Sequence, residues 1–224
     1  MLNEFIQLLK RDNLMVQALN ECYEMADLCK AMLSASVPSL RQHDDADVDL
    51  DIDATDKKLN AFERDVRRKV MTHLSLVQGG DLSSGLMLVS IVIDLERIGD
   101  YCKNIHKLAL EHPTRLKGGP VEEELARIEA VAEDHFIRSM EAFKSGDAVA
   151  ARDLMASYKS DISGACADVE NRLVRGEIDL PASEAVTVAL YLRFLKRISS
   201  HSRNLVSSLV NPFPRIGYKA KKQD

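Results

Sequence analysis

The chain has 224 residues, of which 46% are hydrophobic, 29% are charged and 5% are aromatic, and its formal net charge is −5. This composition is typical of a folded, soluble protein and excludes disorder over most of the chain. The net negative charge argues against a dedicated duplex-DNA binder, so we expect no direct contact with nucleic acid. The longest apolar run, Leu86 to Ile93, is interrupted by Ser90 and is too short for a membrane span, so we expect no membrane insertion.

The start of the chain and its cysteines point to a reducing compartment. Met1 to Arg11 has no basic region followed by a small-residue cleavage site, so it does not resemble a secretory signal. The four cysteines form no Cys-x-x-Cys pair, which favours reduced, buried thiols. They are Cys22, Cys29, Cys102 and Cys166. We therefore expect a cytoplasmic protein.

Apolar residues of the first half recur at three- and four-residue steps, which predicts helices. The runs extend over Phe5 to Leu33, Val48 to Val77, and Leu82 to Leu110. Pro38 and the Gly79-Gly80-Asp81 turn are expected to separate them. The third run is apolar nearly all round in its first half, so we expect it to lie centrally. Only Asp45 to Asp53 shows an alternation that suggests a strand.

Six aspartates lie between Asp44 and Asp53, just before the second helical run. A calcium-binding loop would need glycine where Leu50 stands, so this spacing does not favour an EF-hand. Acidic residues near a helix start interact favourably with the helix dipole, which is the better interpretation.

The second half repeats the first. Helical runs are expected over about Val121 to Lys144, Asp147 to Arg175 and Ser183 to Leu209. Matching residues one hundred positions apart support the repeat: Leu95/Leu195, Arg97/Arg197, Ile98/Ile198 and Asn104/Asn204. The sequence thus predicts an all-α fold of two tandem three-helix bundles, 1–117 and 118–210, followed by a loose basic tail, 211–224.

The strongest functional pattern is acidic. Glu96 and Asp100 are four residues apart and share a helix face, and Asp56, Asn60 and Glu63 share a face of the preceding helix. If these helices pack antiparallel, the five side chains can converge, and a hard metal ion would relieve the repulsion between their carboxylates.

Two alternatives to this metal site stay open. The acidic face can instead be solvated, with Lys57, Lys58, Arg97 and Lys103 as partners. A carboxylate-bridged metal store or oxidase is a second alternative, but none of the six histidines follows a glutamate by three residues, as ferritin-like metal helices require. Catalytic signatures such as GxxxxGK[ST], GxGxxG, GxSxG and HExxH are absent from the sequence.

A basic cluster lies on the second helical run. It consists of Arg64, Arg67, Arg68 and Lys69, and Lys57 and Lys58 extend it. A solvated outer face explains the cluster, and so does a docking patch for an anionic partner.

Two motifs resemble the PhoU family of phosphate-uptake regulators. The first is Asp94-Leu95-Glu96-Arg97-Ile98-Gly99-Asp100-Tyr101-Cys102-Lys103-Asn104-Ile105, and the second is Asp56-Lys57-Lys58-Leu59-Asn60-Ala61-Phe62-Glu63. The length and the three-plus-three repeat agree with the family up to about Leu209. This resemblance implies two three-helix bundles in a cytoplasmic protein that is not an enzyme.

The resemblance also implies function and ligands. Family members are negative regulators or adaptors that link a phosphate ABC transporter, through its ATPase, to a sensor histidine kinase. Some bind multinuclear iron or zinc clusters through acidic motifs, whose positions Glu96, Asp100, Asp56, Asn60 and Glu63 occupy here. Oxygen ligands alone do not exclude Mg, Mn or Ca. A homodimer and a role beside a different transporter, such as a sodium-phosphate or ion carrier, stay open.

The second half departs from the family pattern. Lys196 stands where the motif has Glu, and Ser200 stands where it has Asp. Lys196 would repel a cation or pair with Asp161 or Asp168. We therefore expect a metal cluster in the first bundle only.

Overall fold

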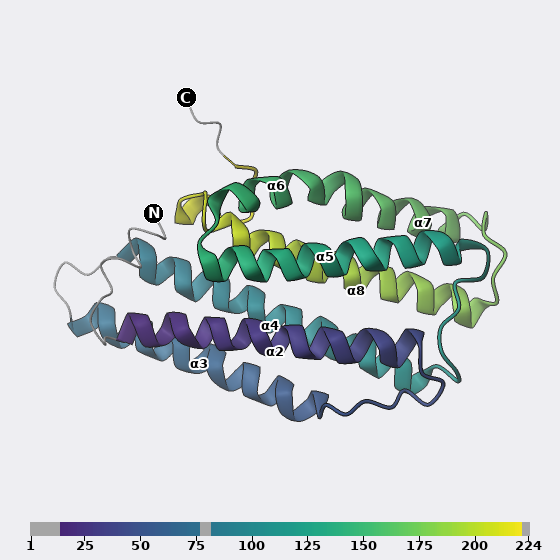
Figure 1. Cartoon of the computed structure of the whole chain (residues 1–224), viewed down its shortest axis with the longest axis horizontal. Helices are drawn as coiled ribbons and strands as arrows, with labels where there is room; N and C mark the ends of the chain where they lie inside the picture. The colour runs from purple at the N-terminus through teal and green to yellow at the C-terminus, as the bar shows by residue number, and fades with distance from the viewer. Residues whose placement is uncertain (1–13, 77–81, 221–224) are drawn as a thin grey trace.

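The computed structural model describes residues 14–76 and 82–220, and within these ranges it is all-helical with no strand (Figure 1). The first bundle contains α2 (Leu14–Arg41), α3 (Ile52–Leu76) and α4 (Leu82–Glu111). The second contains α5 (Glu122–Ser145), α6 (Ala148–Tyr158), α7 (Ala165–Val174) and α8 (Ala182–Ser207). The predicted all-α fold of two bundles is confirmed. The expected Gly79-Gly80-Asp81 turn and the segment Met1 to Arg11 lie outside the described residues.

Helix α2 continues past the proline that was predicted to end it. Pro38 lies inside the helix, which ends at Arg41. A proline costs a helix one backbone hydrogen bond and crowds the preceding turn. Here it falls in the last turn, and its own carbonyl still accepts a hydrogen bond from the Gln42 amide at 2.8 Å. The prediction of a break at Pro38 is therefore wrong by one turn.

The start of α3 shows why aspartates precede it. The Asp51 carboxylate accepts a hydrogen bond from the Ala54 amide at 2.8 Å, which caps the helix, and Asp53 lies in its first turn. The residues of the expected strand-like alternation form no strand. The helix then buries the apolar stripe of Leu59, Val66 and Val70.

Helix α4 is central, as its apolar run predicts. It packs against α2 and α3 in its own bundle and against α8 of the other bundle. Neighbours on three sides explain why apolar residues occur nearly all round its first half. The motif helices α4 and α8, which resemble each other in sequence, therefore form the main contact between the bundles.

The predicted helix over Asp147 to Arg175 is one run with a local change of pitch. Asp147 caps α6 by accepting hydrogen bonds from the amides of Val149 and Ala150 at 2.9 and 3.0 Å. A π-helical turn, η2 (Lys159–Gly164), joins α6 to α7. Short 3₁₀ turns, η1 (Gly119–Val121) and η3 (Phe213–Arg215), precede α5 and follow α8.

The segment after α8, expected to be loose, makes specific contacts as far as Tyr218. The Asn211 side chain donates hydrogen bonds to the carbonyls of Arg215 and Tyr218 at 3.0 and 2.9 Å. The Gly217 amide donates to the Ser207 hydroxyl at 2.7 Å. These bonds fold residues 211–218 back onto the end of α8.

All four cysteines are buried and reduced, as predicted. Burial raises the pKa of the Cys166 thiol to about 12, so this thiol is neutral near pH 7. Among the described residues, no helix combines the length and apolarity that crossing a membrane requires.

Candidate functional site: the acidic face of α3 and α4

The two acidic motifs meet where α3 and α4 pack closely. Gly99 makes this approach possible, because a Cβ at that position would overlap Leu59 Cδ1 on α3. Glu96 and Asp100 flank Gly99 on α4, while Asp56, Asn60 and Glu63 lie one turn apart along α3. We call these five side chains the acidic face.

The carboxylates of the acidic face are largely withdrawn from water. Asp56 is 6% exposed. The side chains of Glu96 and Glu63 are 12% and 15% exposed, and that of Asp100 is 31% exposed. Burial raises the pKa of Glu96, and the nearby carboxylates of Asp100, Glu63 and Asp56 raise it further. The structure thus brings all four carboxylates within electrostatic reach of one another.

Three of these carboxylates have a cationic partner within 2.9 Å. Lys103 Nζ lies 2.6 Å from Asp56 Oδ2, and Arg97 Nη1 lies 2.9 Å from Asp100 Oδ2. Arg67 Nη2 lies 2.7 Å from Glu63 Oε1. Lys103 and Arg97 are two of the partners that the solvated-face interpretation names.

Glu96 has the weakest compensation of the four. Its closest cation is Arg97, whose Nε atom lies 3.5 Å from Glu96 Oε2, and Arg97 also forms an ion pair with Asp100. Asn60 does not offset its charge, because the Asn60 amide donates to the Asp56 backbone carbonyl at 3.0 Å.

The arrangement is not a formed coordination shell. Across residues 14–76 and 82–220, no three His, Cys, Asp or Glu side chains gather in a way that could hold a metal ion. For the acidic face to bind one, the side chains of Lys103, Arg67 and Arg97 would have to turn away. The ligand role of the five residues stays a prediction.

The corresponding position in the second bundle is occupied by an ion pair. Lys196 Nζ lies 3.3 Å from Glu170 Oε2 on α7. Asp168 pairs instead with Arg172, and Asp161 accepts a hydrogen bond from Ser160. The prediction that Lys196 pairs with Asp161 or Asp168 is therefore wrong, because α7 presents Glu170 to it.

A buried polar cluster joins α4 to α8. Asp94 Oδ1 accepts hydrogen bonds from His201 Nδ1 at 2.7 Å and from Asn204 Nδ2 at 3.1 Å. The Tyr101 ring stacks on the His201 ring, and Arg197 Nε donates to the Tyr101 hydroxyl at 3.2 Å. Asp94 lies within the first sequence motif, but its spacing there predicts no role for it. Its only signal is a carboxylate at a position where the helix is otherwise apolar.

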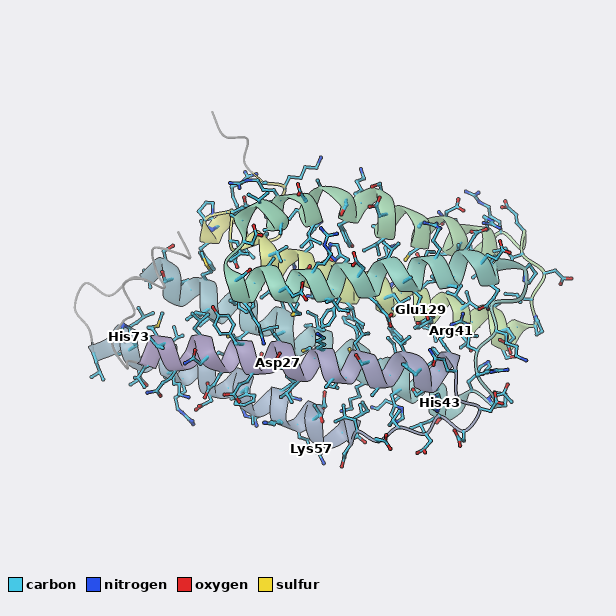
Figure 2. All side chains as sticks on the ribbon, viewed as in Figure 1. Asp27, Arg41, His43, Lys57, His73 and Glu129 are labelled. Carbon is cyan, nitrogen blue, oxygen red and sulfur yellow. The ribbon has the colours of Figure 1, made fainter. Side chains whose placement is uncertain are left out.

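A second link joins α2 to α5, and sequence reasoning missed it entirely. Arg41 Nε lies 2.9 Å from Glu129 Oε2, and its Nη2 lies 2.5 Å from Glu122 Oε1 (Figure 2). The Tyr191 hydroxyl of α8 donates to the same Glu129 oxygen at 2.9 Å. No pattern in the sequence singles out this arginine at the end of an amphipathic helix.

These features define an all-helical, double-bundle protein with a half-buried acidic face on its first bundle. Residues 22–109 match the family model of the PhoU domain, and this range contains both acidic motifs. Residues 22–109 are thus similar to a PhoU domain, and the resemblance predicted from the motifs is confirmed over that range.

Two solved structures share the fold over most of the chain. The crystal structure of PhoU from Pseudomonas aeruginosa matches with a TM-score of 0.75 and 21% identity, over 88% of this chain and 95% of that one. The phosphate transport system regulatory protein PhoU from Streptococcus pneumoniae matches with a TM-score of 0.70 and 17% identity, over 88% and 93% of the two chains. No curated protein matches the sequence. The two solved structures therefore show the fold of this chain.

Proposed function

We propose that this chain regulates phosphate uptake and phosphate-starvation signalling as a negative regulator of the PhoU kind. The observation that carries the proposal is the PhoU domain over residues 22–109, which includes both acidic motifs. The double-bundle fold shared with two PhoU structures supports it.

The proposed mechanism needs no catalysis. A partner that binds one arrangement of the chain better than another shifts the population toward that arrangement by the difference in affinity. The α4–α8 contact is the proposed place for two arrangements. Asp94 accepts hydrogen bonds from His201 and Asn204 across it, and Arg197 donates to Tyr101, so a shift of one bundle against the other would exchange these polar contacts. The absence of the common catalytic signatures from the sequence agrees with a binding role.

The proposed partners are the ATPase of a phosphate ABC transporter and a sensor histidine kinase. Biolayer interferometry with the purified chain and each purified partner from the same organism tests this, with inorganic phosphate added and omitted. The ATPase of an unrelated ABC transporter is the negative control. Binding to the phosphate transporter ATPase or to the kinase supports the proposal. Binding to neither, or binding only to a sodium-phosphate carrier, contradicts it.

We also propose that the acidic face makes this regulation metal-dependent, through iron or zinc in the first bundle. The supporting observation concerns Glu96. Its pKa is raised by burial and by three neighbouring carboxylates. A bound cation would relieve that repulsion, while Lys103, Arg67 and Arg97 compete with it for the same oxygens. Metal occupancy would therefore change the ion pairs between α3 and α4.

Elemental analysis tests metal binding. The parent chain is compared with Glu96→Ala/Asp100→Ala, and with Glu123→Ala/Glu141→Ala, which removes two exposed carboxylates of α5. All three are exposed to Fe, Zn and Mn, and circular dichroism checks folding. We expect metal in the parent and the α5 variant only. A parent that stays metal-free contradicts the metal proposal.

A further inference from the structure

The outer side of α3 carries a line of cations that the acidic face does not use. Lys57, Arg64 and Arg68 are seven and four residues apart, so they project from one line along the helix, and all three are exposed. This line lies about a quarter turn from the acidic face, and Figure 2 places Lys57 at the outer edge of the bundle. It is locally positive on a chain whose net charge is −5.

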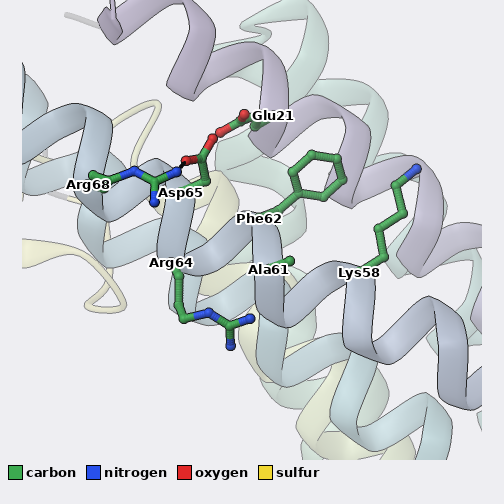
Figure 3. Close-up of a pocket in the computed structure, with 7 residues that line it drawn as sticks. All are labelled: Glu21, Lys58, Ala61, Phe62, Arg64, Asp65 and Arg68. Atoms are coloured by element: carbon green, nitrogen blue, oxygen red, sulfur yellow. Dashed lines mark hydrogen bonds and ion pairs between the residues drawn. The ribbon is translucent and has the colours of Figure 1, made fainter.

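The line borders an open groove between α2 and α3. The groove has a volume of about 460 Å³ (Figure 3). Its lining residues are Glu21, Lys58, Ala61, Phe62, Arg64, Asp65 and Arg68. Lys58 lies over the Phe62 ring, 5.4 Å from its centroid, so an aromatic surface is flanked by cations. We call the groove and the cation line the basic groove.

The carboxylates in the groove are already compensated. Lys69 Nζ lies 2.6 Å from Asp65 Oδ2 and also contacts Glu21, while Arg68 pairs with Asp65. The Arg68 side chain nevertheless remains 72% exposed. Arg64 makes no ion pair with any described residue. The exposed side chains of Arg64 and Arg68 are therefore available to pair with an anionic partner.

A purely solvated helix face usually mixes charges of both signs at i,i+4 spacing. Asp53 begins this line, four residues before Lys57, but from Lys57 to the 66% exposed Met71 the other member is Ala61, and no carboxylate alternates with the three cations. Cations around a small apolar floor complement a segment that carries carboxylates beside an apolar side chain.

We propose that the basic groove binds an acidic amphipathic segment of a partner protein. Carboxylates of that segment would pair with Lys58, Arg64 and Arg68, and one apolar side chain would lie over Ala61 and Phe62. Nucleic acid fits less well, because one aromatic ring offers little stacking and the net charge of the chain repels a phosphate backbone. The inference goes beyond the proposed function, since it identifies the chemistry of a partner and is measured without any transporter.

Fluorescence anisotropy with a labelled peptide tests the proposal. The probe is a synthetic helical peptide with leucines along one face and glutamates elsewhere, and its control replaces every Glu by Gln. The test variant is Arg64→Glu/Arg68→Glu. The matched control is Arg127→Glu/Arg193→Glu, which makes the same charge change at two exposed arginines of α5 and α8.

We expect the parent to bind the Glu peptide, to bind more weakly at higher salt, and not to bind the Gln peptide. The test variant should weaken binding about tenfold or more, while the matched control should change it little. If circular dichroism shows that the test variant is unfolded, Arg64→Gln/Arg68→Gln replaces it with the same expectation.

Three results would overturn the inference. The first is that the parent does not bind the Glu peptide. The second is that both charge-reversal variants weaken binding of the Glu peptide equally. The third is that single-stranded DNA binds more tightly than the peptide, through Arg64 and Arg68. None of these results bears on binding to the transporter ATPase, so failure here and failure of the proposed function remain distinguishable.

Discussion

Replacing Gly99 by alanine tests whether the two acidic motifs are held together by close helix packing. The added methyl group would overlap Leu59 Cδ1 and lie 3.8 Å from Met32 Sδ. Leu59 and Met32 are 1% and 0% exposed, so neither can move out into solvent. Overpacking costs about 1 to 3 kcal/mol, and because neither neighbour can move aside we take the upper part of that range, about 2 to 3 kcal/mol. Alanine recovers up to about 1 kcal/mol through its better helix propensity.

We therefore expect Gly99→Ala to lower the free energy of unfolding by about 1 to 2 kcal/mol in urea titrations followed by circular dichroism. Lys107→Ala, an exposed change on the same helix, should stay within about 0.5 kcal/mol of the parent. Shortening the obstructing side chain should relieve the strain. The double variant Leu59→Ala/Gly99→Ala is therefore expected to lose at least about 1 kcal/mol less than the sum of the single losses. An unchanged or raised stability for Gly99→Ala would refute the close approach of α3 and α4.

Three further predictions concern buried polar groups. Arg41→Met should lower the free energy of unfolding by about 2 to 3 kcal/mol in urea titrations, because the largely buried Glu129 carboxylate, 17% exposed, loses its cation. A loss below about 0.5 kcal/mol would contradict this. Asp94→Ala should lower the free energy of unfolding by about 1 to 3 kcal/mol, because His201 loses its hydrogen-bond acceptor at the bundle contact. If the losses of the two single variants simply add in Asp94→Ala/His201→Ala, the two residues are not directly coupled. Burial lowers the pKa of His135 below its ordinary value of 6.5. As the pH falls, the unfolded chain therefore binds a proton at this histidine before the folded chain does. The stability that neutral His135 supports is present above pH 6.5 and falls as the pH drops below it. Urea titrations across that range should show a shallower fall for His135→Gln, and parallel curves would contradict the assignment.

The helices could be predicted because their apolar spacing is repeated over many residues. The second run was expected from Val48 to Val77, and α3 extends over Ile52–Leu76. The central place of α4 followed from residues that are apolar on more than one face. The break predicted at Pro38 was wrong because the free-energy cost of a proline in a helix depends on how many helical turns follow it. The local sequence does not specify that number.

The acidic face was predictable for a different reason. Spacing of three and four residues fixes which side chains share a helix face, and an antiparallel neighbour brings two such faces together. The choice of partner is a tertiary property. Glu170 rather than Asp168 meets Lys196, and Arg41 reaches Glu129 across 88 residues of sequence. Such pairs depend on how the bundles dock, and no local pattern encodes that docking.

The central claim, regulation of phosphate uptake, is tested most directly in the organism that encodes the chain. Its gene is deleted and then restored, and phosphate uptake and transcription of phosphate-starvation genes are measured in phosphate-rich medium. A negative regulator predicts that deletion raises starvation-gene transcription despite ample phosphate, and that the restored chain represses it again. Unchanged uptake and transcription in the deletion strain would contradict the account.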